Sequence, residues 1–304
     1  MNHGSLGAAD AAFFESRRRG LFWLAYRMLG THADAEDAVQ ETFVKWLHAD
    51  RAAIQTPAAW LTSACTNLCV DMLRAAYRSR VDYVGAWLPE PIHTPADGTP
   101  ETEVELASSL STAFLLLLER LTPKERAAYL LREIFDMPYA QIAVTLGMSE
   151  SACRKLVSRA GAAVGQPQAR HTLPAERQAS LLSAFQAAIQ NADASALAHM
   201  LADDVRLAAD GGGQTTAVRR ELTGKQEVMR FIERGLFRFW RGHEWRHVPL
   251  NGCHGALLYE AGNITASLSF AFDENGTLTH IYIVRNPAKL ARLQSSFYAG
   301  ARRH

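Results

Sequence analysis

The chain has 304 residues, of which 48% are hydrophobic and 21% charged, and its formal net charge is +1. This length predicts two or three globular domains, and the near-zero charge restricts nucleic-acid binding to local basic patches. The absence of a secretory signal, of a membrane-length apolar run and of a disulfide framework predicts a cytoplasmic protein without membrane contact, and neither a metal site nor a cofactor is expected.

Helical periodicity predicts helices over residues 14–29, 33–48 and 57–80. On the second of these, Asp34, Asp37 and Glu41 cluster within roughly 60° of one another, opposite an apolar side. Because phosphate repels carboxylates, this acidic face is suited to a protein partner. A solvated charged face is the simpler alternative.

The helix over residues 57–80 carries a different polar surface. Asparagine and arginine side chains suit contacts with the exposed bases and backbone of a single strand, although a solvated surface would look the same. The opposite side contains Leu61, Cys65 and Leu68 and is predicted to be buried, with Cys65 and Cys69 acting as small hydrophobic residues. The polar surface consists of Ser63, Asn67, Val70, Arg74 and Arg78, with Asp71 beside them.

Residues 81–102 form a predicted linker rich in glycine and proline. It contains an apolar pentapeptide, Trp87-Leu88-Pro89-Glu90-Pro91. Because an exposed linker has no need of Trp87 and Leu88, the pentapeptide is predicted to dock onto another part of the chain.

Helical character resumes over residues 103–165. Thr122-Pro-Lys-Glu125 predicts a helix start with a capping box, and residues 139–158 fit a helix-turn-helix in which Gly147 makes the turn and Ser149 caps the second helix. An ordinary helical hairpin is the alternative. Cys153 and Leu156 are expected to face inward. The outer side carries Ser151, Arg154, Lys155, Ser158 and Arg159; of these, Arg154 and Lys155 are predicted to contact base edges in the major groove and Arg159 to contact phosphate.

Residues 175–304 have the pattern of an α+β domain with a curved antiparallel sheet. A helix is predicted over residues 181–201, and strands are predicted over residues 205–207, 215–218, 264–272 and 278–284. Asp273-Glu-Asn-Gly276 indicates a hairpin between the last two strands. The three glycines after Asp210 predict a tight hairpin or a bulge.

Together these motifs resemble the extracytoplasmic-function sigma factors of the bacterial sigma-70 family over residues 13–165. The resemblance rests on Tyr26-Arg-Met-Leu-Gly30, Asp34-Ala-Glu-Asp37, Gln40-Glu-Thr-Phe43, Trp60-Leu61, Asn67-Leu-x-x-Asp71-x-x-Arg74, Leu121-Thr-Pro-Lys-Glu-Arg126 and the helix-turn-helix. It implies two all-α domains, region 2 at residues 10–80 and region 4 at residues 103–165. Region 2 would bind the β′ clamp of core RNA polymerase through Asp34, Asp37, Gln40 and Glu41. Its next helix would read and melt the minus-ten element through Asn67, Asp71, Arg74 and Arg78, and region 4 would bind the minus-thirty-five duplex.

The pentapeptide and two further motifs resemble the subgroup of these sigma factors that carries a fused SnoaL-like C-terminal domain. The two motifs are Asp210-Gly211-Gly212-Gly213 and Asn286-Pro287-x-Lys289-Leu290. The resemblance implies a cone-shaped α+β domain over residues 175–304 whose glycine loop contacts the linker. We expect this domain to regulate the sigma factor in cis, without a separate anti-sigma protein and with a cavity open to a small-molecule ligand. Ala288 departs from the acidic residue usual in the subgroup.

Two other functions compete with this interpretation. A one-component regulator would bind an operator through the helix-turn-helix and sense a small molecule with the C-terminal cone, but it leaves the acidic face without a role. A cyclase or isomerase would use an acid or base such as Asp210, His247 or His280 in a dry pocket. The sequence offers no paired catalytic constellation, so a protein without enzymatic activity is expected.

Overall fold

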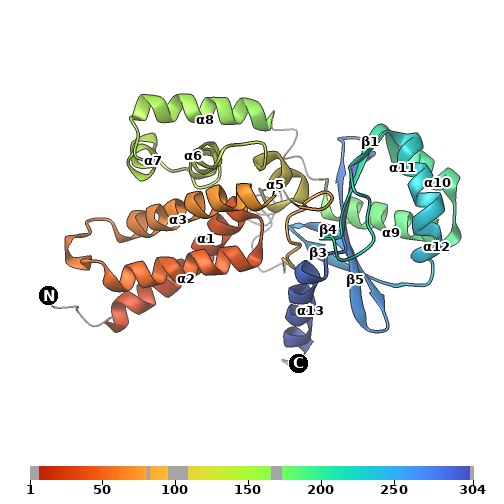
Figure 1. Ribbon diagram of the computed structural model, residues 1–304, viewed down its shortest axis with the longest axis horizontal. Helices are drawn as coiled ribbons and strands as arrows, with labels where there is room; N and C mark the ends of the chain where they lie inside the picture. The colour runs from red at the N-terminus through yellow and green to blue at the C-terminus, as the bar shows by residue number, and fades with distance from the viewer. Residues whose placement is uncertain (1–6, 81–82, 95–108, 166–172, 302–304) are drawn as a thin grey trace. The chain divides into compact units, whose positions relative to one another are not determined.

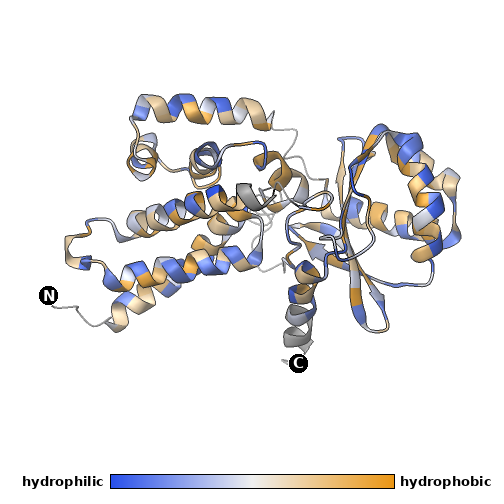
Figure 2. Cartoon of the chain, in the orientation of Figure 1, coloured by the Kyte–Doolittle hydropathy of each residue, from blue (hydrophilic) through white to orange (hydrophobic). Residues whose placement is uncertain are grey.

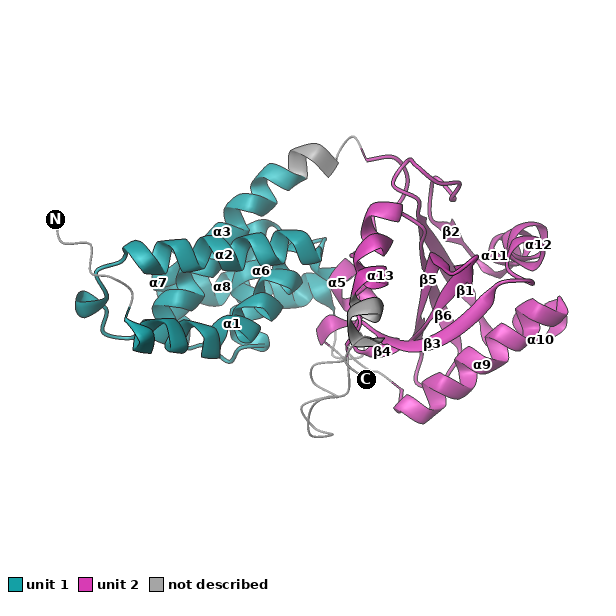
Figure 3. Cartoon of the chain, turned by 90° about the horizontal axis from the view of Figure 1, so that it is seen from below, with its two compact units in different colours: residues 1–81, 117–166 teal, residues 82–116, 167–304 magenta. Residues whose placement is uncertain are grey.

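The computed structural model describes residues 7–80, 83–94, 109–165 and 173–301 (Figure 1). The chain divides into two compact units, which are coloured separately in Figure 3. The first unit comprises residues 1–81 and 117–166, and the second comprises residues 82–116 and 167–304. The linker residues 83–94 therefore belong with the C-terminal part of the chain.

The first unit begins with three mutually packed helices, α1 (Ala8–Leu29), α2 (His32–His48) and α3 (Pro57–Arg80), with the 3-10 turn η1 (Arg51–Ala53) before α3. All three predicted helices are confirmed, and Figure 2 shows hydrophobic and hydrophilic residues interspersed along them. Helix α1 starts earlier than predicted because its first turn is held from outside. The Trp46 indole donates to the Asp10 carbonyl at 3.3 Å, and Arg51 pairs with the Asp10 carboxylate at 3.1 Å.

Three further helices complete this unit: α6 (Pro123–Glu133), α7 (Tyr139–Leu146) and α8 (Glu150–Val164). Thr122 and Glu125 form the predicted capping box at the start of α6. Helices α7 and α8 form the predicted helix-turn-helix. Gly147 makes the turn at φ 61°, a left-handed conformation that glycine adopts without strain, and Ser149 caps α8.

The buried stripe of α8 differs by one residue from the prediction. Cys153 is fully buried, as expected, but Leu156 is only half-buried, and Val157 takes the inner position instead. Residues four and three apart share one side of a helix, so the stripe continues from Cys153 through Val157 to Ala160 and Val164.

The second unit is built on one six-stranded sheet with the order β2-β1-β6-β5-β4-β3. Strands β1 and β6 are parallel, so the prediction of a wholly antiparallel sheet is wrong. The chain completes the other strands before β6 returns beside β1 in the same direction. The strands are β1 (Leu201–Asp210), β2 (Leu222–Thr223), β3 (Glu244–Leu250), β4 (Cys253–Glu260), β5 (Asn263–Phe272) and β6 (Leu278–Val284).

Two other local predictions are corrected. The predicted helix over residues 181–201 is two helices, α9 (Ala175–Asn191) and α10 (Ala194–Met200), because Ala192 has a positive φ of 54° and Asp193 caps the second helix. The predicted strand over residues 215–218 is a loop, since the backbone after Gly211 turns back on itself and pairing resumes only at Leu222.

The sheet has a hydrophobic core on each of its faces. One core contains Phe185 of α9 and Trp240, which follows α11 (Lys225–Phe231), a π-helical turn (Ile232–Leu236) and α12 (Phe237–Phe239). The other contains Leu290 and Leu293 of α13 (Pro287–Ala301) together with Leu88 of the linker. The α+β fold class predicted for this part of the chain is confirmed.

The helix α5 (Thr112–Leu118) begins in the second unit, where Thr112 and Ser269 share a hydroxyl–hydroxyl hydrogen bond of 3.2 Å. Across the described ranges, no helix combines the length and apolar character that crossing a bilayer requires. The same ranges contain no group of three or more His, Cys, Asp and Glu side chains arranged to hold a metal ion.

Candidate functional site

The acidic face of α2 is exposed at Asp37, Gln40 and Glu41. Asp34 differs from them, because it is half-buried and its carboxylate accepts a hydrogen bond of 2.5 Å from the Thr31 hydroxyl at the start of the helix. Within the described part of the chain, Asp37 and Glu41 make no ion pair. Their charges are therefore available to a partner, whereas Asp34 mainly fixes the helix terminus.

An apolar residue extends this face and was not predicted from the sequence. Val44 lies one turn beyond Glu41 and two turns beyond Asp37, and 42% of its surface is exposed. The spacing i, i+4, i+7 was the signal that could have identified it. The exposed surface of α2 therefore pairs carboxylates with a hydrophobic contact, as protein interfaces commonly do.

The polar surface of α3 is only partly exposed. Asn67, Asp71 and Arg74 are exposed, and Arg74 pairs with Asp71 at 3.0 Å, whereas the side chain of Arg78 lies outside the described residues. The expectation that Val70 belongs to this outer surface is wrong, because Val70 is 4% exposed. Helix α3 packs against α6 and α7 as well as against α1 and α2, so a second side of it is covered.

Hydrogen bonds join α3 and α1 to the helix-turn-helix part of the first unit. The hydroxyl groups of Ser63 on α3 and Thr145 on α7 lie 2.6 Å apart. Arg126 of α6 is 1% exposed, and its Nη1 donates to the carbonyl of Met28 and to the carboxylate of Glu119, both at 2.7 Å. From the sequence, Arg126 could be recognised only as part of a motif, because a helical pattern does not reveal that an arginine is buried.

A second buried arginine lies on α1. Arg27 donates to the Trp23 carbonyl at 3.0 Å and lies over the ring of Phe135 at 5.8 Å. Its burial lowers the pKa of the guanidinium to about 10, which leaves it charged near neutral pH. Arg27 therefore serves the packing of the first unit and not DNA binding.

The outer side of α8 presents all five predicted DNA-contacting residues to solvent: Ser151, Arg154, Lys155, Ser158 and Arg159. Their surroundings differ. Arg159 lies 3.9 Å from Glu125, whereas Arg154 makes a close pair with Glu150, with 2.6 Å between Nη2 and Oε1. Lys155 has no ion pair within the described residues, as expected of a side chain available to phosphate or a base.

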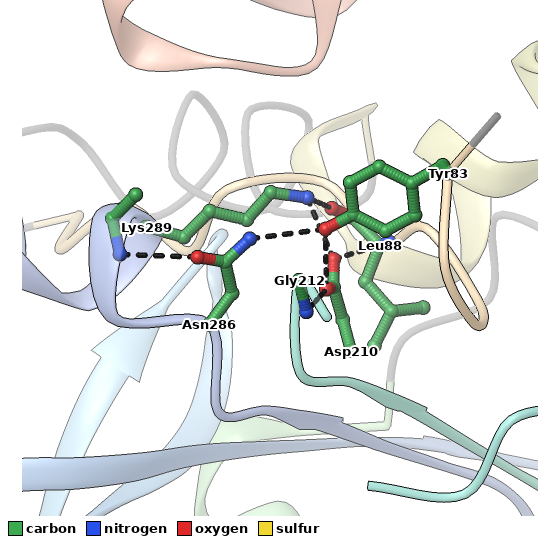
Figure 4. A network of polar contacts seen from close by, with 7 residues as sticks. Tyr83, Leu88, Asp210, Gly212, Asn286 and Lys289 are labelled. Carbon is green, nitrogen blue, oxygen red and sulfur yellow. Dashed lines mark hydrogen bonds and ion pairs between the residues drawn. The ribbon is translucent and has the colours of Figure 1, made fainter. Parts of the chain in front are cut away.

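The centre of the second unit is a buried polar network around Asp210, drawn in Figure 4. Asp210 is 0% exposed, and its carboxylate accepts hydrogen bonds from the Tyr83 hydroxyl at 2.6 Å and from the Leu88 N–H at 3.0 Å. Lys289 Nζ donates to the same carboxylate at 2.7 Å and to the Leu88 carbonyl. The network thus fastens both backbone polar groups of Leu88 to the sheet domain.

Asn286 completes the network. Its Nδ2 donates to the Tyr83 hydroxyl at 3.0 Å, and its Oδ1 accepts from the N–H of Ala288 at 3.0 Å. Burial, followed by the adjacent Asp210 carboxylate, raises the pKa of Tyr83 well above its usual value, so the phenol remains a donor. The side chain of Ala288 is exposed, and its departure from the subgroup pattern leaves these contacts intact.

The pentapeptide is buried in the second unit at four of its five residues. Leu88 and Glu90 are 1% and 4% exposed, Pro89 and Pro91 are also buried, and the half-buried Trp87 ring lies 4.6 Å from Lys289 Nζ. The lysine ammonium and the indole are therefore placed for a cation–π interaction.

The chain beyond the pentapeptide follows the β3–β4 turn. Asn251 N–H donates to the Ile92 carbonyl at 2.8 Å, and Ile92 N–H donates to Asn251 Oδ1 at 3.2 Å. Gly252 N–H donates to the Thr94 hydroxyl at 2.8 Å. Asn251 was not predicted from the sequence, although an asparagine before glycine at a hairpin turn is a recognisable signal.

The glycine loop has no room for a side chain at Gly212 but does have room for one at Gly213. An added Cβ at Gly212 would lie 2.4 Å from Asn286 Nδ2, and at Gly213 it would lie 3.4 Å from the Cβ of Val84. Both glycines have positive φ, 60° and 70°, so alanine would be strained at either position.

Gly212→Ala is expected to lower the midpoint of urea unfolding of the full chain more than Gly213→Ala does. In both variants an alanine in the left-handed conformation lowers the free energy of unfolding by about 1–2 kcal/mol. Only Gly212→Ala also displaces Asn286 and breaks its hydrogen bonds, which lowers the free energy of unfolding by about 1 kcal/mol more. Equal urea midpoints for the two variants would show that the close contact between Gly212 and Asn286 does not contribute to the free energy of unfolding.

The three candidate acid–base residues are each engaged structurally. The Asp210 carboxylate accepts from Tyr83, Leu88, Gly212 and Lys289. His247 Nε2 lies 2.7 Å from Gln186 Oε1, and the ring of His280 stacks on Tyr282 at 5.7 Å. Burial, and secondarily His254, lowers the pKa of His247. The arrangement around Asp210 is that of a structural ion pair and offers no free carboxylate for acid–base chemistry.

Comparisons with known proteins identify both helical parts of the chain. Residues 13–79 match the family Sigma-70 region 2, and residues 111–163 match Sigma-70, region 4. The ECF RNA polymerase sigma factor SigJ of Mycobacterium tuberculosis is 39% identical over 225 residues, which cover 73% of this chain and 72% of that protein. The probable ECF RNA polymerase sigma factor SigI of the same species is 28% identical over 294 residues, covering 95% and 98%. The crystal structure of M. tuberculosis extracytoplasmic function sigma factor SigJ has a TM-score of 0.71 and 32% identity, covering 92% of this chain and 98% of that one.

Proposed function

The chain belongs to the ECF RNA polymerase sigma factors, and on this basis we propose which surfaces it uses and how it is regulated. As an alternative sigma factor it acts in transcription initiation, with core RNA polymerase and promoter DNA as its partners. The one-component regulator is not favoured, because it accounts for the helix-turn-helix but not for region 2.

The polymerase-binding surface that we propose is the outer side of α2. Asp37, Gln40 and Glu41 would contact the β′ clamp, Asp34 would hold the start of the helix, and Val44 would add an apolar contact. The exposure of the three polar side chains and the lack of ion pairs at Asp37 and Glu41 among the described residues support this assignment. Carboxylates in this position would also keep α2 away from the DNA backbone.

The promoter would be read by two helices. On α3, the exposed Asn67, Asp71 and Arg74 are proposed to capture bases of the melted minus-ten element, with Arg78 beyond them. On α8, Arg154 and Lys155 would contact base edges of the minus-thirty-five duplex. Ser151, Ser158 and Arg159 would contact its backbone.

We propose that the C-terminal domain regulates these surfaces in cis through the linker. The observation that carries this proposal is the Asp210 network, which fastens Tyr83 and Leu88 to the sheet domain. The linker connects region 2 to region 4 along the chain. Fixing the linker to the sheet domain would therefore restrict how these two regions can bind DNA. Regulation within the chain would not require a separate anti-sigma protein, and these partners would place the protein in the cytoplasm.

Run-off transcription with core polymerase tests both parts of the proposal. The full chain should support promoter-dependent initiation, whereas ending the chain at residue 174 should change the amount of transcript, and Trp87→Ala should change it in the same direction. Promoter activity identical to that of the full chain in both variants would contradict regulation in cis. Initiation no better with the full chain than with core polymerase alone would contradict the assigned surfaces.

A further inference from the structure

The ring of Tyr139 lies between two arginines of the helix-turn-helix part of the chain. Tyr139 is the first residue of α7, and its ring centroid is 4.3 Å from the guanidinium carbon of Arg154 on α8 and 4.9 Å from that of Arg132 on α6. Both distances are within the range of a cation–π interaction, and the closer contact is made with the arginine proposed to read bases.

Arg154 is held from a second direction by Glu150, one turn earlier on α8. Glu150 Oε1 accepts hydrogen bonds from Arg154 Nε at 3.2 Å and from Nη2 at 2.6 Å. The Arg154 side chain is nevertheless 59% exposed, and among the described residues its Nη1 has no hydrogen-bond partner. The ring and the carboxylate therefore fix the plane of the guanidinium while leaving both N–H groups of Nη1 available to a base.

Fixing an arginine in this way changes what it contributes to recognition. A free arginine side chain loses up to about 2 kcal/mol of rotamer entropy when it is ordered, and a preorganised one loses less per hydrogen bond formed. Bidentate arginine–guanine contacts are strongly directional, so orientation affects the choice of base more than the overall attraction to phosphate.

We propose that Tyr139, acting with Glu150, is a positioning residue that sets the base preference of Arg154 in the upstream promoter element. The inference rests on the proposed role of α8. It assigns a part in promoter selectivity to a residue on the first helix of the helix-turn-helix. Arg159, whose side chain lies over no ring among the described cation–π contacts, would supply attraction that depends less on sequence.

The test uses holoenzyme made from core polymerase and the full chain. The template is a promoter library with a randomised upstream element, in which each sequence is linked to a barcode in the transcribed region. Arg154→Ala should reduce discrimination at the bases it contacts about 5- to 150-fold. Tyr139→Leu should reduce discrimination at the same bases about 2- to 5-fold, and Tyr139→Phe, which keeps the ring, should retain it.

Two matched variants separate positioning from general damage. Arg132→Gln removes the other guanidinium on the Tyr139 ring and should leave base preference unchanged. Glu150→Gln should reduce discrimination in the same direction as Tyr139→Leu, and it keeps the inference testable if Tyr139→Leu does not fold. In an Arg154→Ala background, Tyr139→Leu should have no further effect on base preference, because nothing remains to be positioned.

The inference is overturned if Tyr139→Leu and Glu150→Gln leave base preference unchanged while Arg154→Ala alters it. It is also overturned if Tyr139→Leu weakens transcription from all library members equally, which is the result expected of a purely structural residue. Unchanged preference in Arg154→Ala would contradict both this inference and the proposed role of Arg154. Failure of the unaltered chain to support transcription from any library member would contradict the proposed function itself.

Discussion

Reversing the charges of Asp37 and Glu41 to lysine should weaken binding of core RNA polymerase by more than about 100-fold without unfolding the protein. Both side chains are exposed, and no ion pair inside the described chain is lost with them. Placing like charges against a complementary protein surface costs several kcal/mol, which corresponds to this loss of affinity. The affinity can be measured by titrating labelled core polymerase with each variant.

A charge-matched control is available in the C-terminal domain. Asp204→Lys combined with Glu233→Lys changes the net charge equally at two other exposed positions and should leave the affinity within a few-fold of the unaltered chain. Raising the salt concentration should reduce the difference in polymerase affinity between the two double variants, because salt screens exposed charges at the edge of an interface. Equal affinities for both double variants at low salt would exclude α2 as the docking surface.

Asp210→Ala should destabilise the C-terminal domain by about 3–5 kcal/mol and release the linker, because it leaves the Lys289 ammonium buried without its counter-charge. It also removes the acceptor of the Tyr83 hydroxyl and of the Leu88 N–H. The expected observations are a lower free energy of unfolding and faster amide hydrogen exchange in residues 83–94. Promoter activity should change in the same direction as it does after removal of residues 175–304.

The exposed pair Arg246–Glu244 is a matched control for this ion pair. Its N–O distance is 2.7 Å, the same as in the Lys289–Asp210 pair, but both its side chains are more than half exposed. Glu244→Ala should therefore change stability by less than about 1 kcal/mol. In the double variant Asp210→Leu with Lys289→Met, neither charge is buried, and part of the lost stability should return. If Asp210→Ala lowers the free energy of unfolding no more than Glu244→Ala does, the Asp210 network is not what holds the linker.

The helical parts of this protein could be predicted from the sequence because their signals are local. Thr122 with Glu125, Gly147 and Ser149 each act on backbone groups within a few residues, and each has the predicted role in the structure. The alternation along β5 is equally local, since one face of the strand is buried in the main core of the second unit. The exposed residues of α2 and α8 follow from helical periodicity in the same way.

Several of the errors arose where distant segments meet, whereas the break between α9 and α10 is local, at Ala192 and Asp193. The direction of β1 relative to β6 depends on topology, and the burial of Val70 depends on the packing of other helices around α3, which no periodicity within α3 reports. The networks around Asp210 and Arg126 join residues far apart in the chain, with Lys289 bonded to Leu88 across 201 positions. For the linker, the resemblance to a subgroup indicated a contact with the glycine loop. Neither the motifs nor the composition indicated that the Tyr83 hydroxyl would donate a hydrogen bond to Asp210.

The distance along the chain between Leu88 and Lys289 has a consequence for biosynthesis. The ribosome makes the apolar pentapeptide 201 residues before the lysine that caps it, an interval of about 10 to 40 s at ordinary elongation rates. Throughout that interval Trp87 and Leu88 have no completed sheet to pack on, so a nascent chain exposes them to chaperones and proteases. The helices of the first unit are complete by residue 166, and they can therefore fold and meet polymerase before the domain that holds the linker has been synthesised.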